Sequence, residues 1–241
     1  MTESDTPRFE IGRKRVRAYF AGRPVADTRN PVLVWERPYY PTYYLPADDV
    51  GTGLLSPTGR TRDDAELYTL RVGEREAVDA AARFPRSPVE ALRGLVRLDW
   101  AAMDAWFEED EQVFTHARDP YTRVDILPSS RHVRVELDGV VIAESRRPHL
   151  LFETHLPVRY YVPRVDVRLD LLEPTATVTH CPYKGSAEHW SVRLDSSAGS
   201  AVHQDVVWSY PTPLPESTRI AGLMSFYDGK VHILVDGEPL G

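Results

Sequence analysis

Apolar and polar side chains alternate along short segments of this chain, and that pattern predicts β-strands. Residues 133–137 read VRVEL, with apolar side chains on one face and charged side chains on the other. This period of two residues is typical of a strand with one buried face. The Asp138-Gly139 dipeptide that follows favours a two-residue hairpin turn. The segment therefore predicts an antiparallel hairpin.

The hairpin pattern belongs to an internal repeat. Residues 16–58 align without a gap on residues 133–175, at an offset of 117, with 17 identities in 43 positions. Unrelated segments of average composition would share about three. Both copies contain Tyr-Tyr-x-Pro, at residues 43–46 and 160–163. We infer two copies of one β domain.

The copies lose register beyond residue 58. AELYTLRV at 65–72 matches AEHWSVRL at 187–194 at an offset of 122, so the first copy lacks five residues. The lost stretch includes HCPYKG, residues 180–185 of the second copy. Because the fold does not require this turn, we expect a degenerate first copy and the larger aromatic cleft in the second domain.

Residues 87–113 have no match in the second copy and carry helical features, unlike the strand pattern of the repeat. Asp99 is a suitable helix cap, and Trp100, Met103 and Phe107 would lie on one stripe of a helix. We therefore predict a mainly β protein of two tandem compact domains with a short helix in the connecting region. The predicted divisions are a first β domain over 1–98, a helix and ordered connector over 99–130, and a second β domain over 131–241.

Composition limits the class of protein. Apolar residues make up 42 % of 241 residues, enough for a buried core, and a net charge of −7 argues against nucleic-acid binding. One cysteine cannot form an internal disulfide, which favours a reducing compartment. The polar N-terminus and the absence of a long apolar run predict a soluble cytoplasmic protein without membrane contact, as a monomer or weak homodimer.

Cys181, the only cysteine, admits three interpretations: an inert buried thiol, a wall of a binding pocket, or a nucleophile. Lys184 lies three residues away and would favour the thiolate if it were close. A general base is less evident, because His180 points to the opposite strand face and His189 has no fixed direction. Paired metal-ligand spacings are absent from the sequence, so we expect no metal and no cofactor.

Charged positions that both copies share predict a structural salt bridge in each domain. These pairs are Arg29/Arg146, Glu36/Glu153 and Asp49/Asp166. The alternative is that Glu153 or Asp166 supplies the acid, base or ligand anchor beside the cysteine turn. The basic run Arg13, Lys14, Arg15, Arg17 suggests a solvated strand edge or, alternatively, an anion site.

Aromatic residues beside prolines accompany the cysteine turn in the second copy only, and this suggests a ligand pocket. The predicted ligand-binding residues are Tyr161, Cys181, Lys184, Trp208, Tyr210 and Glu153. The leading function is small-molecule binding. One alternative is an enzyme whose catalytic candidates are Cys181, Lys184 and Glu153, and another is a protein-interaction module. The connector residues His116, Arg118 and Asp119 form a second-ranked candidate site.

The second copy resembles a known family. Its segments LLFETHLPVRYYVPRVDV, THCPYKGSAEHWSV and VVWSYPTPLPE are similar to the domain of unknown function 427, in the tandem form of actinobacterial proteins. The resemblance implies a compact β-tent domain, shared with some zinc-binding and ligand-binding modules. Those relatives hold zinc through pairs of cysteines, so the metal does not carry over to a chain with one.

Overall fold

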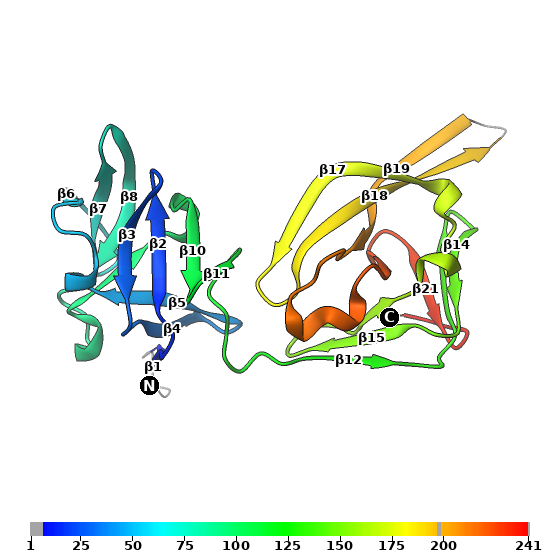
Figure 1. Ribbon diagram of the computed structural model, residues 1–241, viewed down its shortest axis with the longest axis horizontal. Coiled ribbons are helices and arrows are strands. Elements are labelled where there is room, and N and C mark those ends of the chain that lie inside the picture. The colour runs from blue at the N-terminus through cyan, green and yellow to red at the C-terminus, as the bar shows by residue number, and fades with distance from the viewer. Residues whose placement is uncertain (1–6, 197–198, 241) are drawn as a thin grey trace. The chain divides into compact units, whose positions relative to one another are not determined.

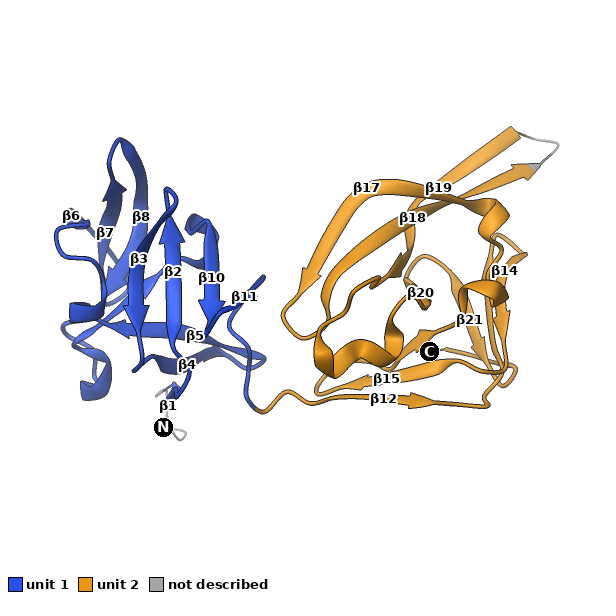
Figure 2. Ribbon diagram, viewed as in Figure 1, with its two compact units in different colours: residues 1–120 blue, residues 121–241 orange. Residues whose placement is uncertain are grey.

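The computed structural model describes residues 7–196 and 199–240. The chain divides into two compact units, Met1–Pro120 and Tyr121–Gly241, here called unit 1 and unit 2 (Figure 2). Both consist of β-strands with short 3-10 turns, so the prediction of a mainly β protein with two domains is confirmed. Within the described residues, no helix has the length and hydropathy needed to cross a bilayer.

Unit 1 contains two sheets (Figure 1). The first has the strand order β1-β4-β5-β9-β8-β7-β6, and the second β11-β10-β2-β3. Its elements are β1 (Arg8–Ile11), β2 (Val16–Phe20), β3 (Arg23–Thr28), β4 (Val32–Arg37), β5 (Tyr40–Pro46), η1 (Ala47–Asp49), β6 (Leu55–Arg62), β7 (Ala65–Val72), β8 (Arg75–Arg83), η2 (Glu90–Leu92), β9 (Leu95–Leu98), η3 (Trp100–Ala102), β10 (Ala105–Glu108) and β11 (Glu111–Val113).

Unit 2 contains sheets of order β12-β15-β16, β17-β18-β19-β20 and β14-β13-β21-β22. A bridge between Val162 and Met224 joins the first two, which gives the strand order of the large sheet in unit 1. Its elements are β12 (Val124–Pro128), β13 (Val133–Leu137), β14 (Val140–Ser145), β15 (His149–Glu153), β16 (Arg159–Tyr161), η4 (Arg164–Asp166), η5 (Leu169–Leu171), β17 (Leu172–Cys181), β18 (Gly185–Ser196), β19 (Gly199–Ser209), η6 (Pro215–Ile220), β20 (Met224–Phe226), β21 (His232–Val235) and β22 (Glu238–Pro239).

The two units repeat the same pairings at the offset found in the sequence. The isolated bridge Ala26–Val50 in unit 1 corresponds to Ala143–Val167 in unit 2. The hairpin β2–β3 likewise corresponds to β13–β14, with a register shift in each. The prediction of two copies of one domain is therefore confirmed, and the match extends to strands that the sequence comparison did not align.

The helix after Asp99 is shorter than predicted. The short helix is confirmed as the 3-10 turn η3, and the Asp99 side chain caps it by accepting a hydrogen bond from the Ala101 N–H at 3.1 Å. The longer helical stripe as far as Phe107 is wrong, because residues 105–108 form strand β10. Trp106 alternates with Phe107 there, is buried, and pairs with Ala18 of β2.

The basic run near residue 15 binds carboxylates of the same chain. Lys14 Nζ lies 2.5 Å from the buried Glu108 carboxylate, and Arg17 pairs with Asp110 at 2.7 Å. The acidic β10–β11 hairpin and the basic β2 segment therefore neutralise one another. These ion pairs account for the basic run without an external anion.

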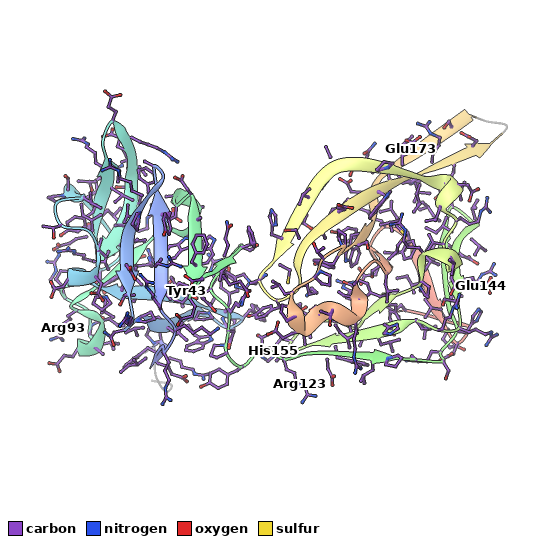
Figure 3. The ribbon with its side chains drawn as sticks, viewed as in Figure 1. Tyr43, Arg93, Arg123, Glu144, His155 and Glu173 are labelled. Carbon is purple, nitrogen blue, oxygen red and sulfur yellow. The ribbon has the colours of Figure 1, made fainter. Side chains whose placement is uncertain are left out.

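Each unit has its own apolar core. In Figure 3 the buried Tyr43 lies inside unit 1, whereas Arg93 and Glu144 lie at the surface of their units. The inward faces of the alternating strands supply the two cores. Their largest buried members include Phe20, Leu45 and Leu70 in unit 1, and Tyr161, Ile142, Leu151 and Met224 in unit 2.

Candidate functional site

The six residues predicted to form a ligand site lie together in unit 2. Tyr161, Trp208 and Tyr210 belong to one buried cluster against which Cys181 packs, and Lys184 pairs with Glu153 beside it. They come from the ends of β15, β16 and β17, the β17–β18 turn, β19 and the residue after it (Figure 1). Elements distant in sequence therefore assemble this group, which we call the unit 2 cluster.

A buried ion pair is the polar centre of the unit 2 cluster. Lys184 Nζ donates a hydrogen bond to Glu153 Oε2, and the two side chains are only 11 % and 7 % exposed. Charges this deeply buried persist only when they are paired. An ammonium group has three donors, and Glu153 is the acceptor that Lys184 has among the described residues. Donor capacity therefore remains inside the cluster.

Aromatic rings lie next to this ion pair, since Glu153 is close to Tyr161 and Tyr210. Trp208 Nε1 donates to the Tyr161 hydroxyl at 3.1 Å, with the rings edge to face, and Tyr227 lies against Trp208 at 4.4 Å between centroids. Burial raises the pKa of Tyr161 and of Tyr210, and the neighbouring Cys181 and Glu153 add to the rise. Both phenols therefore remain protonated at neutral pH.

His189 is a cluster residue whose position the sequence left open. It is 2 % exposed, and its Nε2 lies 2.9 Å from the Thr179 hydroxyl. Its Nδ1 has no hydrogen-bond partner within the described chain, which is uncommon for a buried polar atom. Burial lowers the pKa of His189, so the ring is neutral at pH 7. In the alignment of the two copies, His189 stands opposite the apolar residue Leu67, and this was the indication in the sequence that His189 is buried.

The surroundings of Cys181 favour binding over nucleophilic chemistry. The thiol is half-buried, and the Lys184 ammonium that would stabilise a thiolate is already bonded to Glu153. A nucleophile needs a base within hydrogen-bond reach. The histidine next to Cys181 in sequence, His180, is hydrogen-bonded to Ser186 across the hairpin instead, at 2.9 Å.

The prediction that the shared charged residues pair with one another is wrong, because each shared glutamate takes a cation from outside that set, Arg97 in unit 1 and Lys184 in unit 2. In unit 1, Glu36 accepts hydrogen bonds from the Tyr44 hydroxyl at 2.5 Å and from Arg97 at 2.8 Å. Arg97 comes from β9, so it replaces the lysine of the turn that copy 1 lost. Burial of Tyr44 and its hydrogen bond to Glu36 raise the pKa of the Tyr44 hydroxyl.

The shared aspartates bind a hydroxyl group, not the shared arginines. Asp49 accepts from Thr28 at 2.5 Å, and the equivalent Asp166 accepts from Ser145 at 2.7 Å. Asp166 also pairs with Arg147, which lowers its pKa. These aspartates therefore fasten the 3-10 turn after the Tyr-Tyr-x-Pro motif to the preceding hairpin.

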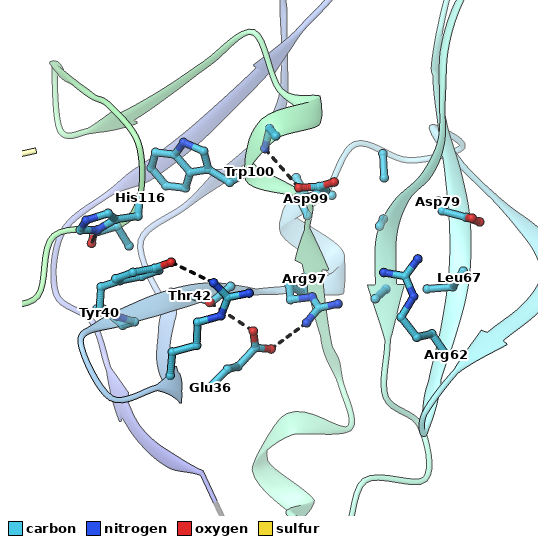
Figure 4. Close-up of a pocket in the computed structure, with 18 of the residues that line it drawn as sticks. Glu36, Tyr40, Thr42, Arg62, Leu67, Asp79, Arg97, Asp99, Trp100 and His116 are labelled. Carbon is cyan, nitrogen blue, oxygen red and sulfur yellow. Dashed lines mark hydrogen bonds and ion pairs between the residues drawn. The ribbon is translucent and has the colours of Figure 1, made fainter. Parts of the chain in front are cut away.

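The expected asymmetry between the copies is not supported by the described residues. A cavity of about 460 Å³ with aromatic walls lies in unit 1, between Tyr40, Trp100 and His116 on one side and β8 on the other (Figure 4). A cavity of about the same volume in unit 2 lies away from the unit 2 cluster and has no Phe, Tyr or Trp in its lining, so the predicted larger aromatic cleft in the second domain is not supported. Trp208 stands in unit 2 at the position that Ala82 holds in unit 1, and its ring packs against Tyr161 and Tyr227.

The three connector residues take separate partners. His116 stacks on Tyr40 at 4.1 Å and lines the unit 1 cavity, whereas Arg118 pairs with Glu111. Asp119 accepts a hydrogen bond from Trp35 Nε1 at 2.8 Å. Of the three, His116 is the one that lines this cavity.

Across residues 7–196 and 199–240, no three His, Cys, Asp or Glu side chains gather as a metal-binding group. A family model described as Domain of unknown function (DUF427) matches residues 8–109 and, separately, residues 125–237. No curated protein matches the chain. The two matches correspond to the two structural units.

Proposed function

The chain belongs to the domain of unknown function family DUF427, in tandem arrangement, and we propose that it binds a small molecule through the unit 2 cluster. Lys184 and Glu153 would be the polar anchors, and Tyr161, Trp208 and Tyr210 the apolar walls. Cys181 would form the half-exposed edge. A mainly aromatic enclosure with a few converging polar groups is the usual composition of ligand sites.

The buried Lys184–Glu153 pair is the observation that carries this proposal. A core needs no such pair, because buried ion pairs are at best weakly stabilising compared with apolar residues of the same volume. Here Glu153 holds an ammonium group that retains donors, among rings that exclude water. The unpartnered Nδ1 of His189, whose ring lies parallel to Tyr227, adds a second polar atom for a ligand.

The chemistry of these groups defines the ligand class. The free donors of Lys184 suit a carboxylate or phosphate oxygen, and the aromatic walls suit a flat apolar portion. We further propose a reducing, cytoplasmic location and a monomer or weak homodimer, consistent with a single half-buried thiol.

A thermal-shift screen of small carboxylates and phosphates tests the proposal. We expect some compounds to stabilise the wild type, and to bind Lys184→Met at least ~10-fold more weakly by calorimetry, since a charged hydrogen bond is worth about 1.5–3 kcal/mol. Tyr210→Phe provides a milder test at the wall. The matched control is Arg97→Met, which removes the equivalent cation from unit 1 and should retain binding. Equal affinity of wild type and Lys184→Met for every hit would contradict the proposal.

Cys181→Ser separates binding from the alternative of thiol catalysis. The two side chains are similar in size, so a pocket wall predicts modest weakening of affinity with the fold retained. A nucleophile predicts loss of turnover at unchanged affinity, because serine without a positioned base is a poor nucleophile. Product formed by the wild type alone, at equal affinity, would replace the binding proposal by an enzymatic one.

A further inference from the structure

Strand register identifies corresponding positions in the two units. Leu67, Ala82 and Arg97 are cross-strand partners along β7, β8 and β9. The equivalent partners along β18, β19 and β20 are His189, Trp208 and Ser225. The same space in each unit is therefore bordered by different side chains.

The unit 1 cavity borders the position that corresponds to Trp208. Trp208 is buried among Tyr161 and Tyr227 in unit 2. The small Ala82 side chain takes this position in unit 1, where it is buried against Leu67 and Phe84 at the edge of the cavity of about 460 Å³. This volume falls within the range of roughly 300–1,000 Å³ found for ligand pockets.

Flat aromatic groups form one wall of this cavity. Tyr40 and His116 stack with ring centroids 4.1 Å apart and planes inclined by 15°. Trp100 lies beside them and is itself stacked on Trp106 at 4.8 Å (Figure 4). Such a wall favours a planar ring, since aromatic pairs gain energy beyond the area that they bury.

Three arginines and three carboxylates line the cavity, and two of the arginines have no carboxylate partner among the described residues. Asp79 pairs with Arg60 at 2.9 Å, and Arg97 pairs with Glu36. By contrast, the Arg37 side chain bonds to the Tyr40 hydroxyl at 3.3 Å and to no carboxylate, and the Arg62 side chain has no hydrogen bond or ion pair within the described residues. Two guanidinium groups at the cavity are therefore available to an anion.

We propose that the unit 1 cavity is a binding site for a planar aromatic anion, such as an aryl carboxylate. Its ring would lie against Trp100 and Tyr40, and its anionic group would be held by Arg37 and Arg62. Guanidinium groups match carboxylates in a bidentate geometry. This site lies in unit 1, goes beyond the function proposed for unit 2, and does not depend on it.

Calorimetry of the full chain with 2-naphthoate tests the site. We expect binding of 2-naphthoate, with at least ~10-fold weaker binding of the uncharged 2-naphthamide and of the non-aromatic cyclohexanecarboxylate. Arg62→Gln and Arg37→Gln should each weaken naphthoate binding several-fold. Both arginines are exposed, so these variants should fold.

The decisive variant is Ala82→Trp, which introduces the side chain found at the equivalent place in unit 2. It should abolish naphthoate binding in unit 1 while leaving every polar group intact. If circular dichroism shows that Ala82→Trp does not fold, Tyr40→Leu replaces it. This variant removes part of the aromatic wall and should weaken naphthoate binding in calorimetry. Lys184→Met removes the anchor proposed for carboxylates in unit 2 and should retain naphthoate binding in unit 1, and Ala82→Trp made in this background should remove that remaining binding, which separates the two sites. No naphthoate binding, binding equal to that of naphthamide, unchanged binding when Ala82→Trp is added to Lys184→Met, or loss in Lys184→Met alone would each overturn the proposal.

Discussion

Replacing Lys184 by methionine is the sharpest test of the unit 2 cluster as a desolvated ion pair. The change leaves the Glu153 carboxylate, 7 % exposed, without its cation. Removal of one partner from a buried pair costs about 3–5 kcal/mol, because the other charge remains buried. Unit 2 has about 120 residues, so its unfolding entropy near ~0.25 kcal/mol/K converts this to a fall of roughly 12–20 °C in Tm.

The double variant Lys184→Met/Glu153→Gln distinguishes this cost from general loss of packing. Removing both charges should recover much of the stability, since an uncharged pair of similar volume carries no desolvation penalty. Differential scanning calorimetry of the full chain at pH 7 measures all three proteins. Arg97→Met is the control, and it should cost only about 1 kcal/mol, because Arg97 and Glu36 are 29 % and 31 % exposed.

The pH dependence of Lys184→Met gives a second signature. An unpaired Glu153 destabilises the folded variant as long as it carries a buried charge. The variant should therefore regain stability relative to wild type in acid solution, where protonation removes that charge. A loss below about 1 kcal/mol for Lys184→Met, or no recovery in the double variant, would refute the argument.

Three further outcomes are expected. Iodoacetamide should alkylate half-buried Cys181 more slowly in native than in urea-unfolded protein, by mass spectrometry, and a faster native rate would favour the nucleophile. Burial lowers the pKa of His189, so as the pH falls the unfolded chain binds a proton at this residue before the folded chain does. The free energy of unfolding should therefore decrease below about pH 6.5, by at most about 1.4 kcal/mol per pH unit. Urea titrations of His189→Gln should show a shallower decrease, and an unchanged slope would exclude His189 as its cause. Ser145→Ala removes the 2.7 Å bond to Asp166 and should cost about 1–2 kcal/mol by urea titration, whereas no measurable loss would show that the hydroxyl does not hold the turn.

The sequence alone determined the repeat, the β class and the members of the unit 2 cluster. Alternation of apolar and polar residues encodes which strand face is buried, and this is a local property. Two copies in one chain then showed which residues the fold needs in both, including Glu36 and Glu153. The five-residue difference around HCPYKG correctly pointed to a longer hairpin in unit 2, where β17 and β18 have 10 and 12 residues and the corresponding β6 and β7 have 8 each.

Only the tertiary structure decided the partners and the open space. The segment Ala105–Glu108 has helix-compatible spacing, yet it becomes a strand because pairing with β2 buries Trp106. Glu36 takes its cation from β9 and Glu153 from the β17–β18 turn, a choice made by strands distant in sequence. The position of the unit 1 cavity was also decided by the tertiary structure, because its aromatic wall joins Tyr40 of β5, Trp100 of η3 and His116, which are distant in sequence.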